Sequence, residues 1–125
     1  MYKGKAQDGG GGASKAMAAH RCRRMLEIRE VLGWTPFPGS LNLTLDKPFD
    51  RSQPKISAMI HEKQPGGDYE SKWEQKLFHF WPIKINGIDA AAVLIDGKQH
   101  SAHFLEVYAP VRLRDLGAEF EIEHA

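Results

Sequence analysis

Leucines alternate with polar residues in the segment Ser-Leu-Asn-Leu-Thr-Leu-Asp at positions 40–46. A period of two residues is typical of a β-strand that buries one face and leaves the other in solvent. The leucines are therefore expected to face a core. The polar side chains of Ser40, Asn42, Thr44 and Asp46 are expected to share the opposite face.

Four further segments, 77–85, 88–95, 104–108 and 120–123, have the composition and alternation of short strands. Asn86-Gly87 separates the first two, and this dipeptide favours the positive φ angles of a tight hairpin turn. Residues 47–73 contain three prolines and the pair Gly66-Gly67 at irregular spacing. We therefore expect long connections around a short segment near residues 56–60.

One main helix is predicted from Ser14, a suitable N-cap, to Leu32, with Gly33 ending it. Its apolar positions form an approximate stripe, and arginines at positions 21, 23, 24 and 29 supply the polar side. One helix and many short strands without an internal repeat predict a mainly β protein built as a closed or nearly closed barrel, in a single domain spanning residues 1–125.

The composition excludes several classes of partner and cellular location. The 125 residues include 17 Lys and Arg against 16 Asp and Glu, so there is no overall basic field, and a nucleic-acid partner is not expected. Cys22 is the single cysteine, the N-terminus lacks the apolar run of a signal peptide, and no apolar stretch is long enough to span a membrane. These features predict a cytoplasmic, soluble protein, and we expect a monomer with no membrane partner.

The segment Pro-Phe-Pro-Gly-Ser-Leu-Asn-Leu at 36–43, which follows Leu32-Gly33-Trp34, resembles the signature of the CTP-dependent riboflavin kinases of archaeal type. Segments 81–85, 88–91 and 105–114 are similar to family segments in the same order, so the resemblance covers about residues 4–122. It implies a six-stranded cradle-loop barrel. It also implies a magnesium-dependent transfer of the γ-phosphoryl group of CTP to the 5′-hydroxyl of riboflavin, which yields FMN and CDP.

The resemblance also implies roles for individual residues. Ser40 and Asn42 match the magnesium ligands, and Glu106 matches a flavin-site glutamate placed to orient or deprotonate the acceptor hydroxyl. Lys98 stands at a flavin-contacting position that is threonine in the family pattern. The implied nucleotide-binding residues are Asp8, Gly9, Gly10, Gly11 and Gly12 in a glycine-rich loop, together with Val111, Arg112, Leu113 and Arg114.

Each assignment has an alternative. The glycine run can be a loop without a ligand, Ser40 and Asn42 can be the solvent face of a strand, and Glu106 can be an ordinary exposed glutamate. His100 and His103 have a spacing that suits zinc, although no third ligand stands nearby in sequence. Because the sequence departs from the family at Lys98 and His103, a kinase with another acceptor remains open, as does a flavin-, nucleotide- or DNA-binding barrel without catalysis.

Overall fold

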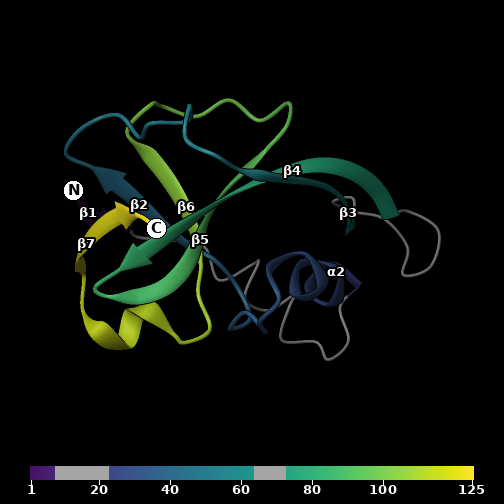
Figure 1. Cartoon of the computed structure of the whole chain (residues 1–125), viewed down its shortest axis with the longest axis horizontal. Helices are drawn as coiled ribbons and strands as arrows, with labels where there is room; N and C mark the ends of the chain where they lie inside the picture. The colour runs from purple at the N-terminus through teal and green to yellow at the C-terminus, as the bar shows by residue number, and fades with distance from the viewer. Residues whose placement is uncertain (8–22, 64–72) are drawn as a thin grey trace.

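The computed structural model describes residues 1–7, 23–63 and 73–125 (Figure 1). The predicted helix start at Ser14 and the glycine run lie outside these ranges. The elements in chain order are β1 (Tyr2–Ala6), α2 (Arg23–Leu32), β2 (Leu41–Leu45), β3 (Ile56–Lys63), β4 (Trp73–Ile85), β5 (Ile88–Ile95), β6 (Phe104–Tyr108), the 3-10 turn η1 (Leu113–Leu116) and β7 (Glu119–His124). No helix in the described residues is long and apolar enough to cross a bilayer.

The strands form a closed ring. Neighbouring strands follow the order β4, β5, β6, β2, β1 and β7, and the last of these pairs back onto β4, so six strands make a barrel with no free edge between them. All of these pairings are antiparallel. The seventh strand, β3, pairs with the first half of β4, whereas β7 pairs with the end of β4 at residues 83–85. The predicted six-stranded barrel is therefore confirmed, with β3 added outside the ring.

Two hydrophobic cores lie on opposite sides of the shared strands. The barrel interior contains the leucines of β2 together with Trp81, Ile83 and other apolar side chains. The second core lies on the outer face of β3, β4 and β5, where Phe78 and Phe80 pack with Ile28 of α2. Alternation along β4 and β5 sends successive side chains into one core and then the other, which explains why these strands are apolar on both faces.

Several predicted elements match the structure closely. β2 buries its leucines and exposes Asn42 and Thr44. The β4–β5 hairpin turns at Asn86 and Gly87, with φ angles of 47° and 79°. Gly33 has a φ of 80° and its N–H donates to the carbonyl of Arg29 at 2.9 Å, so it ends α2 as a left-handed cap.

Other elements differ from the sequence-based expectation. β4 begins at Trp73, four residues before the predicted strand, and β3 is a full strand of eight residues. β1 was not predicted, because its five residues, Tyr-Lys-Gly-Lys-Ala, offer a single large apolar side chain and a central glycine. Its pairing with both β2 and β7 stabilises it as a strand, so the tertiary structure outweighs a weak local propensity.

Replacement of Gly4 by valine is expected to lower the free energy of unfolding by about 1–3 kcal/mol, the usual cost of overpacking a core. Gly4 is buried in β1, and a Cβ there would lie 3.0 Å from Cδ1 of Ile122 and 3.1 Å from Cδ2 of Leu45. Urea unfolding measures the change. The matched control is Lys3→Val on the exposed face of the same strand, which adds the same side chain without the clash. Equal stability of both variants would contradict this packing.

Candidate functional site

Three of the residues singled out from the sequence meet on the outer face of β2 and β6. Asn42 and Glu106 are direct partners across the two antiparallel strands, with Asn42 exposed and Glu106 half-buried. The paired register ends at Leu41 and Val107, and one further step places Ser40 across from Tyr108. Because Leu41 and Val107 face the barrel interior, alternation puts all four of these neighbours on the outside.

The turn before β2 is held against the end of β6. Gly39 has a φ of 101°, a conformation that L side chains rarely adopt, so a glycine is needed where the chain enters β2. The backbone N–H of Phe37 donates to the carbonyl of Ala109 at 2.7 Å. The Pro-Phe-Pro-Gly turn therefore lies beside the segment that begins at Pro110, and the two sequence segments that carry much of the family resemblance are neighbours in space.

Gln7 joins three parts of the site and was not identified from the sequence. Its N–H donates to the carbonyl of Asn42 at 2.9 Å, and its side-chain Nε2 donates to Oγ1 of Thr44 at 3.0 Å. Its own carbonyl accepts a hydrogen bond from Nη2 of Arg114 at 3.2 Å. Asp8 follows directly, so the chain enters the glycine run from a point bonded to both β2 and the 111–114 segment. In the sequence, the position directly before Asp8 was the only signal that could have identified Gln7 as part of the site.

The nucleotide-binding residues expected at 111–114 have different environments. Val111 is 41% exposed, whereas the Leu113 side chain is buried in the barrel interior, so only the backbone of Leu113 can reach a ligand. Arg112 pairs with Asp115, with Nη1 3.1 Å from Oδ1. The other nucleotide residues of the prediction, from Asp8 to Gly12, lie outside the described part of the chain.

The connection between β5 and β6 places an aromatic pair beside Glu106. The rings of His100 and Phe104 stack with centroids 4.0 Å apart and 21° between their planes. Phe104 lies on the same face of β6 as Glu106, two residues away. Lys98 is exposed in the turn after β5, and its N–H donates to the carbonyl of Ile95 at 3.1 Å. The site thus offers a flat aromatic surface next to a carboxylate.

The histidine pair considered for zinc has other contacts. His103 Nδ1 lies 3.1 Å from the carbonyl oxygen of Leu45, to which the ring N–H donates. The His100 ring stacks on Phe104. Within residues 1–7, 23–63 and 73–125, no three His, Cys, Asp or Glu side chains gather as metal ligands.

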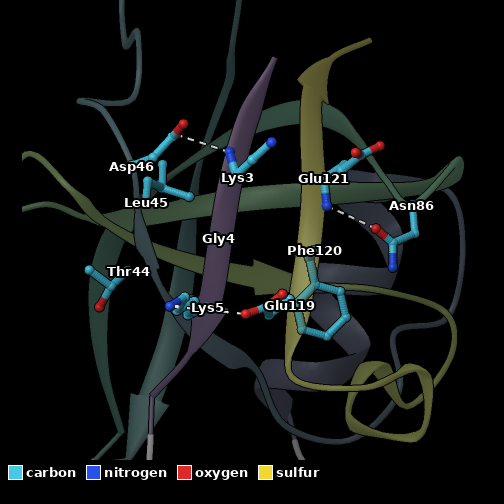
Figure 2. Close-up of a pocket in the computed structure, with 10 residues that line it drawn as sticks. All are labelled: Lys3, Gly4, Lys5, Thr44, Leu45, Asp46, Asn86, Glu119, Phe120 and Glu121. Atoms are coloured by element: carbon cyan, nitrogen blue, oxygen red, sulfur yellow. Dashed lines mark hydrogen bonds and ion pairs between the residues drawn. The ribbon is translucent and has the colours of Figure 1, made fainter.

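A shallow pocket of about 700 Å³ lies along the outer face of β1, next to this site (Figure 2). It is lined by Lys3, Gly4, Lys5, Thr44, Leu45, Asp46, Asn86, Glu119, Phe120 and Glu121. Lys5 Nζ is 4.0 Å from Glu119 Oε1, and the backbone N–H of Lys3 donates to Oδ1 of Asp46 at 3.0 Å. That backbone N–H lowers the pKa of Asp46. The pocket meets the β2–β6 surface at Thr44 but contains neither Asn42 nor Glu106.

Comparisons with known proteins agree on one family. A family model that carries the short name CTP-dep_RFKase and the description "Domain of unknown function DUF120" matches residues 10–120. Curated proteins named riboflavin kinase are also similar. Those of Pyrobaculum aerophilum (35% identical over 91 residues, 70% of this chain), Ignicoccus hospitalis (31% over 115 residues, 90%) and Archaeoglobus fulgidus (36% over 92 residues, 71%) are examples. The matches span 41%, 61% and 38% of these relatives, so the chain corresponds to only part of their length.

Replacement of Gln7 by proline is expected to lower the free energy of unfolding by about 1–3 kcal/mol, because proline has no N–H to donate to the carbonyl of Asn42. Gln7→Ala keeps that N–H and loses only the exposed bond to Thr44, so it should cost less than about 1 kcal/mol. Urea unfolding of both variants checks this. Equal losses would show that the backbone bond does not tie β1 to β2.

Proposed function

The chain belongs to the family of CTP-dependent riboflavin kinases, and from this premise we propose that it transfers the γ-phosphoryl group of CTP to the 5′-hydroxyl of riboflavin, giving FMN and CDP. The observation that carries the proposal is the cross-strand pair of Asn42 and Glu106 on one open face, with Ser40 next to them. In this proposal the side-chain oxygens of Ser40 and Asn42 would hold a metal, and the neighbouring Glu106 carboxylate would meet the acceptor hydroxyl, so that both reactants are positioned for phosphoryl transfer.

Magnesium suits the oxygen atoms on this face. The Ser40 hydroxyl and the Asn42 amide oxygen are hard, neutral ligands two residues apart, with Ser40 directly before β2 and Asn42 exposed to solvent within it. Two neutral ligands bind magnesium weakly, so the phosphates of the nucleotide are needed to complete its coordination. When bound, the ion would neutralise charge on those phosphates. The metal is accordingly expected to bind together with CTP.

The donor is proposed to lie between the glycine run and the 111–114 segment. Gln7 bonds to Asn42 on one side and to Arg114 on the other, so a nucleotide held by residues 8–12 would start beside both. Backbone N–H groups in a glycine-rich turn can approach phosphate oxygens closely, because no Cβ stands in the way. Arg114 adds positive charge beside Gln7, whereas Arg112 is paired with Asp115.

The acceptor is proposed to lie over β6. The stack of His100 on Phe104 offers a flat surface for an aromatic ring system such as an isoalloxazine. Glu106, two residues further along β6, would then orient the ribityl 5′-hydroxyl and accept its proton as the new O–P bond forms. Because the transition state is loose, positioning by these groups matters more than the strength of the base.

Replacement of Asn42 by alanine is expected to reduce FMN formation from CTP and riboflavin at least about 10-fold, because one oxygen ligand of the metal is lost. The assay measures FMN with CTP or ATP and with magnesium or EDTA. Wild-type product should require CTP and magnesium. Thr44→Val, two residues along the same exposed face, is the matched control and should stay within about 2-fold of wild type. Equal product from ATP, or a fully active Asn42→Ala variant, would contradict the proposal.

Replacement of Glu106 by glutamine is expected to reduce kcat about 10- to 100-fold, at or below the lower end of general-base effects, because positioning carries most of the acceleration. The KM for CTP should not change, since Glu106 is assigned to the acceptor. Steady-state kinetics with each substrate varied in turn makes the test. Glu121→Gln, a carboxylate on the outer face of β7, serves as the control for loss of one negative charge. A rise in the KM for CTP alone would move Glu106 to the donor side.

A further inference from the structure

Arg24, in the first turn of α2, has its guanidinium group held over the outer face of the barrel. Its Nη2 donates a hydrogen bond of 2.6 Å to the hydroxyl of Tyr108, and its Cζ lies 5.4 Å from the centre of the Phe78 ring. The Tyr108 ring is completely buried between the barrel and α2. A phenol anchored in a core and an aromatic face together determine where this cation lies, and none of the roles proposed above uses it.

Tyr108 occupies one corner of the β2–β6 site. Glu106 lies two residues before it on the same face of β6, about 7 Å away along the strand. Ser40 lies across from it when the β2–β6 register is continued by one residue, and Asn42 lies across from Glu106. Arg24 therefore holds a positive charge at the hydroxyl end of the Tyr108 side chain, on the same outer face of the barrel as the proposed metal ligands and the proposed acceptor carboxylate.

We propose that Arg24 contacts the γ-phosphoryl group of the donor and neutralises charge on it during transfer, with Tyr108 as the residue that positions it. This rests on the proposed function, which it deepens by assigning a catalytic cation. In the reaction, the bond between the γ-phosphorus and the β–γ bridging oxygen breaks while the acceptor oxygen bonds to phosphorus. The hydroxyl proton goes to Glu106. Charge on the three peripheral γ-oxygens persists throughout, and a neighbouring guanidinium stabilises it.

The chemistry of arginine suits this role. The guanidinium is charged at every physiological pH and presents five N–H donors in a planar fork, so one group can bond a phenol and a phosphate oxygen together. Lysine would supply the charge without the fork. A purely structural function, in which Arg24 only attaches α2 to the barrel, predicts a loss of stability without any discrimination between ligands.

The first experiment compares the binding of CTP and CDP, with magnesium, to wild type and to Arg24→Met by calorimetry. Only CTP carries the γ-phosphoryl group, so its Kd should rise about 10-fold in the variant while the Kd for CDP stays within about 2-fold. Arg29→Met, which removes an exposed arginine from the last turn of the same helix, should change neither value. If the Kd values for CTP and CDP rise equally in Arg24→Met, or if neither changes, the proposed role of Arg24 is wrong.

The second experiment measures kcat for FMN formation and adds guanidinium chloride at low millimolar concentration. Arg24→Ala should lower kcat at least about 100-fold; a catalytic arginine usually contributes about 10³- to 10⁵-fold. Free guanidinium should restore part of the activity of this variant. Arg24→Lys should be intermediate, and Tyr108→Phe should lower kcat about 10-fold through loss of the positioning bond. If Arg24 had only a structural role, added guanidinium would not restore activity. Absence of rescue in an Arg24→Ala variant that circular dichroism shows to be folded would therefore refute the assignment.

The two experiments separate the two proposals. If wild type binds CTP more tightly than CDP through Arg24 but makes no FMN, the acceptor assignment fails and the cation assignment stands. If wild type makes FMN and the Arg24 variants behave like wild type, the kinase stands and Arg24 does not act on the phosphoryl group. Failure of wild type to bind either nucleotide would overturn both.

Discussion

Closure of the strand ring through β1 is the constraint on which the rest of the structure depends. β1 pairs with β2 on one side and β7 on the other, and without it the ring would open and leave β2 and β7 each with an unpaired edge. Closure is possible because Gly4 lets β1 approach the side chains of Leu45 and Ile122 in the interior. It also determines where β1 ends. Gln7 then bonds to Asn42, so the chain reaches the glycine run next to the strand that carries the proposed metal ligands.

A single strand, β6, contributes to both the core and the site. Leu105 and Val107 fill the barrel interior, while Glu106 and Tyr108 face outward, as strict alternation requires. The outward side chains differ in their surroundings. Tyr108 is buried in the core that includes Ile28 of α2, whereas Glu106 is half-buried. Within two residues, β6 therefore passes from a dry core at Tyr108 to the partly exposed carboxylate of Glu106.

Much of the local structure was predictable because the relevant signals lie within a few residues. The strict alternation in β2, the Asn-Gly turn of the β4–β5 hairpin and the glycine cap of α2 each depend on backbone preferences that neighbouring residues do not override. β1 and the full length of β3 and β4 were not predictable in the same way. Their residues have weak strand signals, and hydrogen bonds to strands distant in sequence stabilise them.

The sequence by itself determined the barrel class, the polar face of β2 and the family resemblance, since these follow from periodicity and from short motifs. Only the tertiary structure decided which polar residues meet. Asn42 and Glu106 are far apart in the chain, and the register of two strands makes them neighbours. Arg24 was one of several arginines on a predicted polar helix face, yet the packing of α2 across the barrel brings it to Tyr108. Such meetings depend on long-range pairing and helix docking, which no local pattern encodes.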